Sequence, residues 1–332
     1  PSPLALVEPA CVQISNLANR MRYDDAIGLA CTLLAQLGMP VPLADTARSL
    51  EAEMDRFDAH VKDGALKRLS DRSALEDQRL LGVAKLMNRV GTTAYFCRPV
   101  LSRWFQMRLV RLWIEHGFCA AMLNPTGYVS CSTISTRNDY ATGYAIGRIA
   151  LATGQTREGA TETWRTQHCF GLFTSHWREP LEEGLAHARA AFEGLYRAGS
   201  LDFACFTFRT SLAATLEICK DLREMRDEIA TALSFTRKTG NLHAELSYIT
   251  YQQLVRALEG STASLGSFTD DAFNEDAHLA AAQGNTYAKS YFHIYRALSA
   301  CIFNDVKTLI SHSEAAVALI KDIPGVYPTA LA

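Results

Sequence analysis

Apolar residues recur three and four positions apart along most of the chain, with polar residues between them. In "EEGLAHARAAFEGLYRAG", Leu185, Ala188, Phe192 and Leu195 follow this spacing. The segment "NLHAELSYITYQQLVRALEG" shows the same pattern. This spacing places apolar side chains on one face of an α-helix, whereas a β-strand alternates with a period of two. Because stretches with the shorter period are scarce, the pattern predicts a nearly all-α chain.

Three of the predicted helices begin after the same short motif, found in "RAGSLDFA", "KTGNLHAE" and "AQGNTYAK". Each holds a Gly (Gly199, Gly240 or Gly284), then Ser or Asn, then Ala four or five residues after the Gly. Gly suits the left-handed position that ends a helix, and Ser or Asn caps the next helix.

With Gly154 and Gly325 the intervals become 45, 41, 44 and 41 residues. A regular period of this length predicts a tetratricopeptide-like α-α superhelix, an α-solenoid, with long and irregular repeats. The alternative is chance spacing among the 20 glycines of the chain.

The first third of the chain is less regular. Residues Tyr23–Gly38 resemble a tetratricopeptide helix and are followed by a proline-containing turn. We expect flexible loops at "CSTISTRND" (131–139) and "EGSTASLGSFTDD" (259–271), which are rich in turn-forming residues. We assign residues 1–130 to an N-terminal helical part of the array and residues 131–332 to helical hairpins that continue the same superhelix.

Composition narrows the class of protein. The net charge of −2 gives the chain no overall positive charge that would attract nucleic acid or an anionic membrane. No apolar run approaches the ~20 residues of a membrane span. The nine cysteines are scattered and form no C-x-x-C pair, which favours core thiols in a reducing cytoplasm over disulfides or zinc. The start lacks Met and a signal pattern, so we expect an excised fragment or a processed chain.

Several segments together resemble one known protein architecture. They are "TTAYFCRPVLSRWFQMRLVRLWIEHG", "NDYATGYAIGRIALATG" and "SHWREPLEEGLAHARAAFEGLYRAGSLDFACF". Over roughly residues 20–240 the chain is similar to the helical region of very large bacterial and fungal signalling proteins. Those proteins also carry a serine/threonine-kinase-like domain, a STAND-type AAA ATPase, a GAF domain and often a sensor histidine kinase. The resemblance implies a regulatory helical array with no catalytic residue of its own.

The segment "SHWREPL" (175–181) also resembles the histidine-kinase phospho-acceptor box, usually "S-H-E-L-R-T-P-L". Here Trp177 stands in place of the acid that follows the histidine. Pro180 comes one residue early, which turns its position by about 100° around a helix. The chain also lacks a phosphate loop, a kinase motif, a nucleophile elbow and an H-E-x-x-H zinc motif. We therefore predict no catalytic residue, no metal and no cofactor, with an enzyme lacking a recognisable motif as the remaining alternative.

Three places are candidates for binding. The arginines and aromatic residues of "CRPVLSRWFQMRLVRLW" could form a partner or anion groove, or could be a solvated face beside a core face. Tyrosines before and within "GYAIGRIALATG", together with Tyr248, could hold a small inducer. The histidine and tryptophan of "SHWREPL" could bind, or could pack at a helix junction. The candidate residues are Arg98, Arg103, Trp104, Arg108, Tyr140, Tyr144, His176 and Trp177.

These observations favour a non-catalytic regulatory or protein-interaction segment of a multidomain signalling kinase/ATPase in the cytoplasm. Its expected partner is another protein or a neighbouring domain of the same chain, and neither nucleic acid nor membrane. A stand-alone peptide-binding adaptor is one alternative. A domain that senses a small-molecule inducer is the other.

Overall fold

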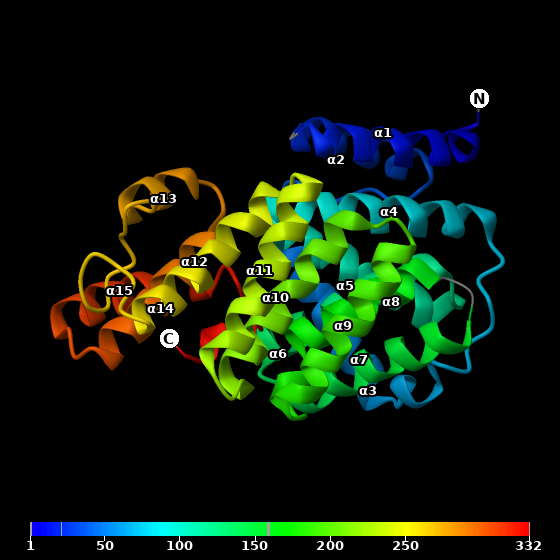
Figure 1. The fold of residues 1–332 in the computed structure, drawn as a ribbon. Helices are drawn as coiled ribbons and strands as arrows, with labels where there is room; N and C mark the ends of the chain where they lie inside the picture. The colour runs from blue at the N-terminus through cyan, green and yellow to red at the C-terminus, as the bar shows by residue number, and fades with distance from the viewer. Residues whose placement is uncertain (1, 21, 158–159, 332) are drawn as a thin grey trace. The chain divides into compact units, whose positions relative to one another are not determined.

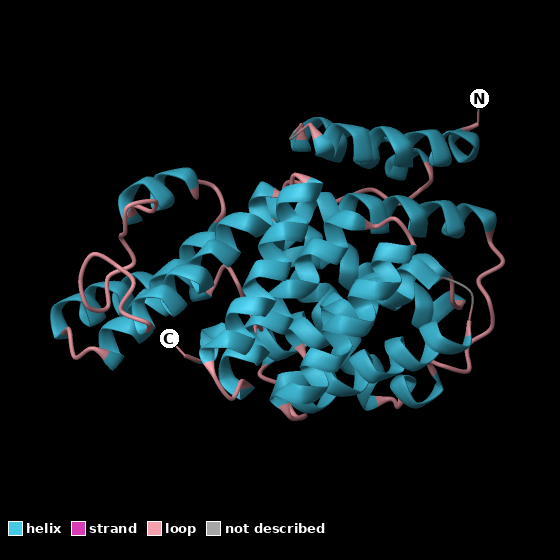
Figure 2. Cartoon of the chain, in the orientation of Figure 1, coloured by secondary structure: helices cyan, strands magenta, loops and turns pink. Residues whose placement is uncertain are grey.

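The computed structural model describes residues 2–20, 22–157 and 160–331. Within these ranges the chain forms fifteen α-helices and five short 3-10 helices. Helices and loops account for all the secondary structure drawn in Figure 2. In the described ranges the extended backbone contributes a single bridge, between Ala74 and Phe118. The prediction of an all-α chain is therefore confirmed.

The chain divides into two compact units, residues 1–170 (unit 1) and residues 171–332 (unit 2). The division proposed from the sequence, at 130/131, falls inside one helix, α6 (Leu123–Arg137). Unit 1 contains the helices that Figure 1 labels α1 to α8, except for the last turn of α8. They are η1 (Pro3–Leu6), α1 (Val7–Asn19), α2 (Tyr23–Gln36), α3 (Thr46–Lys62), η2 (Ala65–Arg68), α4 (Gln78–Cys97), α5 (Pro99–His116), η3 (Ala120–Met122), α6 (Leu123–Arg137), α7 (Tyr140–Thr156) and most of α8 (Ala160–Phe173).

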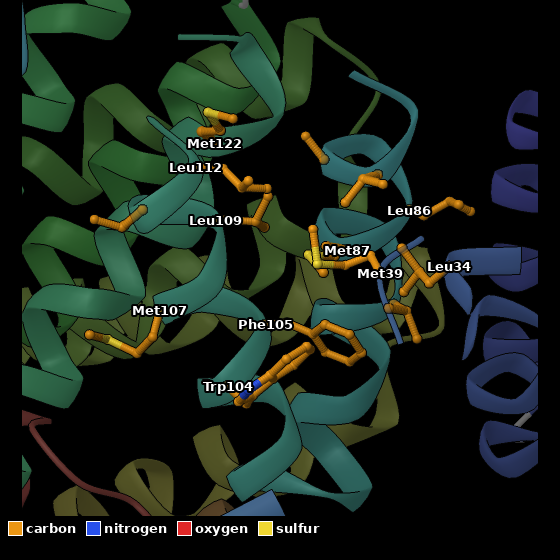
Figure 3. Packing of buried hydrophobic residues seen from close by; sticks show 14 of the residues in the cluster. Leu34, Met39, Leu86, Met87, Trp104, Phe105, Met107, Leu109, Leu112 and Met122 are labelled. Carbon is orange, nitrogen blue, oxygen red and sulfur yellow. The ribbon is translucent and has the colours of Figure 1, made fainter. Parts of the chain in front are cut away.

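Helix α5 forms the centre of unit 1. It packs against α3, α4 and α6, and apolar side chains are buried around its whole circumference. A helix that is apolar on all sides is stable only when other elements surround it. Figure 3 shows Trp104, Phe105 and Leu109 of α5 among buried side chains from α2 and α4.

Unit 2 is a succession of helical hairpins. Its elements after the last turn of α8 are η4 (Ser175–Trp177), α9 (Leu181–Arg197), α10 (Leu201–Ile218), α11 (Leu222–Thr239), α12 (Leu242–Leu258), α13 (Glu275–Ala281), α14 (Thr286–Ile302), α15 (Val306–Ile320) and η5 (Tyr327–Ala330). Helix α9 packs on α10, α11 on α12, and α14 on α15. The predicted loop 259–271 is confirmed, since it lies between α12 and α13.

The repeated glycine motif marks real helix ends. Gly199, Gly240 and Gly284 have φ of +71°, +70° and +88°, the left-handed conformation that glycine adopts without steric cost. Asn241 and Asn285 then accept a hydrogen bond from the backbone N–H three residues on. No such capping bond is seen at Ser200 within the described residues.

The alanines of the motif explain why α10, α12 and α14 are neighbours. Ala204, Ala244 and Ala288 are fully buried, and α12 packs against both α10 and α14. Hydrogen bonds join residues that are 43 and 44 positions apart in this row. The Tyr248 hydroxyl donates to the backbone carbonyl of Cys205 (2.7 Å), and the Tyr295 hydroxyl donates to the hydroxyl of Tyr251 (2.8 Å).

Two local predictions are wrong. Gly154 does not end a helix but lies inside α7, where an added Cβ would come within 2.7 Å of the Thr163 hydroxyl. Most of the predicted loop 131–139 is the last two turns of α6. Its hydroxyls bond back to the helix, as Thr133 does to the carbonyl of Val129 (2.9 Å), so they do not disturb the helical backbone.

Candidate functional site

The predicted arginine groove lies in unit 1, on α5 and at its start. Arg98 forms an ion pair with Asp24 of α2, with 2.6 Å between Nη2 and Oδ1. Arg103 is partly buried on α5, and Trp104 is only 5% exposed, so its indole packs in the core. A binding role for this set stays a prediction.

Arg108 belongs to a cluster of charges between α3 and α5. The carboxylate of Glu53 lies 3.2 Å from Arg108, 3.1 Å from Arg111 and 3.2 Å from Arg56. Burial raises the pKa of Glu53, while the positive charges of Arg108 and Arg56 act in the opposite direction. The positive charge that the sequence showed on this helix is thus partly balanced by a carboxylate from α3.

The candidate tyrosines have different surroundings. Tyr140 is exposed at the start of α7, and the ring centre of Tyr144 lies 5.7 Å from that of Phe170. Tyr248 of unit 2 is fully buried, and its hydroxyl is bonded to a backbone carbonyl. Tyr248 is therefore a core residue of the α10–α12 contact, and the idea that it faces a bound inducer is not supported by its position.

Unit 1 contains a pocket of about 250 Å³, part of it open to solvent, between α4, α5 and α6. Polar side chains at and beside this pocket are already bonded within the protein. Gln106 donates to the Ser102 hydroxyl (3.0 Å), which donates to the carbonyl of Gly91 (2.8 Å). Groups satisfied in this way offer little to a ligand.

His176 and Trp177 lie at the junction of α8 and α9 in unit 2. The Trp177 indole N–H donates to the carbonyl of Phe173 (3.2 Å), and the two neighbouring rings lie 4.7 Å apart. Burial lowers the pKa of His176 to about 4, so the imidazole is neutral at physiological pH.

His176 lines a pocket of unit 2, which encloses about 300 Å³ including space open to solvent. The walls come from the end of α8, the start of α9, the middle of α10 and the C-terminal η5. Polar side chains converge here, and the apolar part includes Leu172 and Leu181. The polar residues of the wall are Ser175, His176, Arg209, Thr210 and Tyr327.

Arg209 is one of the residues that line this pocket, and its guanidinium contacts groups that do not line it. Its guanidinium lies 4.6 Å from the ring centre of Phe206 and 4.1 Å from that of Tyr287, at cation–π distance. It also donates to His243 Nδ1 (3.1 Å). Burial, and then the Arg209 charge, lower the pKa of His243 to about 3, so the two groups do not compete as cations.

Sequence reasoning missed Arg209, Thr210 and Tyr327. Arg209 and Thr210 are neighbours on α10, Tyr327 lies far along the chain in η5, and none of them stands in a motif. The spacing of Gly171 and Gly184 in the sequence did not indicate that both residues would line a pocket.

The cysteines are free thiols, most of them buried or partly buried, with Cys97 and Cys301 exposed. Burial raises the pKa of Cys119 to about 11 and that of Cys131 to about 12. In the described part of the chain, no three His, Cys, Asp or Glu side chains gather as a metal site would require. Among the same residues, no helix combines the length and apolar character needed to cross a membrane.

Comparison of the chain with models of protein families, with curated proteins and with solved structures gives no match. The function must therefore be argued from the geometry of the two units themselves.

Proposed function

We propose that the chain is a non-catalytic helical-repeat segment that acts by binding a protein partner or a neighbouring domain of a cytoplasmic signalling kinase/ATPase. The stacked row α10–α12–α14 supports this proposal, because equivalent helices of successive hairpins pack side by side in repeat proteins. On this proposal the hairpins form part of a tetratricopeptide-like superhelix.

The proposed binding surface is the outer face of α15. Val306, Ile310 and Val317 are 58%, 55% and 57% exposed. At about 100° per residue they fall within about 40° of one another around the helix. The opposite side of α15 packs on α14, where His312 meets His293. Helix α15 therefore exposes an apolar stripe on the side that faces away from α14.

The occupant that fits this apolar stripe is an amphipathic helix. In a repeat array each hairpin covers the apolar face of its neighbour, and an array that ends in solvent carries a polar face at its end. A helix laid along α15 would bury these three side chains. Apolar residues of an amphipathic helix recur every three to four positions, which matches the stripe.

The test starts from the coding sequence on both sides of residues 1–332. The segments that it encodes are expressed separately and titrated against the chain by calorimetry. We expect one helical segment to bind, and Ile310→Glu to weaken it by about tenfold or more, since a buried unpaired carboxylate is costly. Ser311→Glu is the matched control, because it adds the same charge to the adjacent exposed position.

Binding that resists Ile310→Glu would refute the α15 surface. A start codon directly before residue 1 and a stop codon directly after residue 332 would refute the role as a segment. The adaptor alternative would then be tested with amphipathic helical peptides and the same two variants.

A further inference from the structure

The apolar stripe of α15 is bordered by charged side chains on one side only. Lys307, Glu314 and Lys321 are exposed and stand seven residues apart, so their charges form a row in the order plus, minus, plus. At about 100° per residue, this row lies about 40–80° to one side of the centre of the stripe. Ser313 and Ile320 border the stripe on its other side and carry no charge.

A charge row on one side restricts how two copies of α15 can meet. A two-fold axis parallel to the helices makes them parallel and places the two charge rows on opposite sides of the contact, too far apart to pair. A two-fold axis perpendicular to the helices makes them antiparallel and places both rows on the same side. Lys307 of each copy can then lie opposite Glu314 of the other copy, which gives two ion pairs of opposite charge.

This register also joins the apolar side chains. The two-fold axis falls halfway between Lys307 and Glu314, next to Ile310, so the Ile310 side chains of the two copies meet there. Val306 of one copy then lies within about 3 Å, measured along the helix, of the level of Val317 of the second copy. All three exposed apolar residues of the stripe therefore take part in the contact.

The same row allows a second register, with Lys321 opposite Glu314. Its two-fold axis falls next to Val317, so Val306 and Ile310 extend beyond the contact and stay exposed. The burial of apolar surface therefore favours the register in which Lys307 pairs with Glu314.

We propose that a second copy of this chain covers the α15 stripe in an antiparallel, two-fold contact with two Lys307–Glu314 ion pairs, and that the partner helix displaces it. This inference rests on the proposed function, because it names the occupant of the same surface before the partner binds. The second copy takes the place of the capping repeat that closes a helical array.

The dimer is weak enough to be displaced. A contact of one helix with one helix is smaller than the roughly 1,200–2,000 Å² of a stable interface, and exposed ion pairs add little affinity. We therefore expect a dissociation constant between micromolar and millimolar. Because the ion pairs are exposed, salt should weaken the dimer further.

The test is sedimentation equilibrium of the whole chain at low salt, over concentrations from micromolar to millimolar. We expect a reversible equilibrium between monomer and dimer. Ile310→Glu should abolish the dimer, because it places two carboxylates against each other at the two-fold axis.

Exchange of the two charges tests the register. Lys307→Glu or Glu314→Lys alone places like charges at both ion-pair positions and should weaken the dimer about tenfold or more. The double variant restores opposite charges and should recover most of the affinity. Lys321→Glu is the matched control, because it makes the same change in the same row outside the two pairs. Glutamate at position 307, in the first turn of α15, is favoured by the helix dipole, so loss of the dimer there is not explained by unfolding.

A chain that stays monomeric over the whole range overturns the proposal. A double variant that associates no better than the single variants also overturns it, as does a Lys321→Glu variant that loses as much affinity as Lys307→Glu. These outcomes do not bear on the proposed function, which fails when no flanking segment binds in the calorimetric titration.

A segment that does bind provides a further check of the shared surface. Adding it should convert the dimer into a complex of one chain and one segment, because both occupants need the α15 stripe. A segment that binds the intact dimer would place the dimer contact elsewhere and overturn the proposal.

Discussion

Replacing Tyr251 or Tyr295 by Phe removes one of two hydroxyls that lie 2.8 Å apart in the fully buried contact between α12 and α14. Either single substitution leaves the other hydroxyl buried without this partner, at a cost of about 1–3 kcal/mol in the free energy of unfolding. The double variant removes both hydroxyls and keeps the ring packing, with ring centres 4.5 Å apart. We therefore expect it to be more stable than the sum of the single losses by about 1–3 kcal/mol.

Tyr291 supplies a control of opposite sign on the same helix. It is also fully buried, but its hydroxyl has no hydrogen-bond partner within the described residues. Tyr291→Phe should therefore leave stability unchanged or raise it. Tyr196, which is exposed on α9, is the neutral reference, and its replacement by Phe should change stability by less than about 0.5 kcal/mol.

Because the chain has two compact units, one global transition is not guaranteed. Stability is therefore read locally, as the free energy of opening from native-state hydrogen exchange of the α12 and α14 amides. Additive losses in the double variant would contradict the reasoning. A loss for Tyr291→Phe as large as that for Tyr251→Phe would do the same.

Three further predictions concern backbone geometry, packing and pH. Gly240→Ala should cost about 1–2 kcal/mol in urea unfolding, because no atom lies near its added Cβ and only the left-handed backbone is strained, whereas Gly240→Asn should cost less. Gly143→Ala should lower the Tm, since its Cβ would lie 2.5 Å from a side-chain carbon of α6, whereas Gly28→Ala, with open space and a helical backbone, should raise it. Burial lowers the pKa of His176 and of His293 to about 4, so the unfolded chain binds more protons. Stability should fall as pH drops from about 6.5 towards 4, by up to about 3 kcal/mol for the more deeply buried His176, and His176→Gln should reduce that slope.

Much of the helical architecture could be predicted because its signals are local. A left-handed glycine followed by a capping side chain needs no distant contact, and Gly240 with Asn241 behaves as expected. The same conformation occurs with Asn in place of Gly, at Asn138 before α7 and at Asn304 before α15. Including Asn at this position would have found both of those helix starts.

The pocket could not be predicted, because its chemistry depends on which buried polar atoms lack a hydrogen-bond partner. That depends on tertiary packing. Thr210 and Thr215 are alike in sequence terms, as buried threonines on one helix, and only tertiary packing decides which of them lines the pocket. The arginines of α5 are a second case in which contacts between residues distant in sequence decide the surroundings of a side chain. Their pattern suggested an anion groove, but the carboxylate that pairs with Arg108 is Glu53, from a helix distant in sequence.

The distribution of thiols makes the chain suited to fluorescence energy transfer. Cys97 of unit 1 and Cys301 of unit 2 are the exposed cysteines, and burial shields Cys131 and Cys169 from alkylating reagents and also raises their pKa. A maleimide donor and acceptor would therefore attach to one site in each unit once the partly exposed Cys31, Cys119 and Cys219 are replaced. The transfer efficiency would then report directly on the separation of the two units, and on how partner or ligand binding alters it.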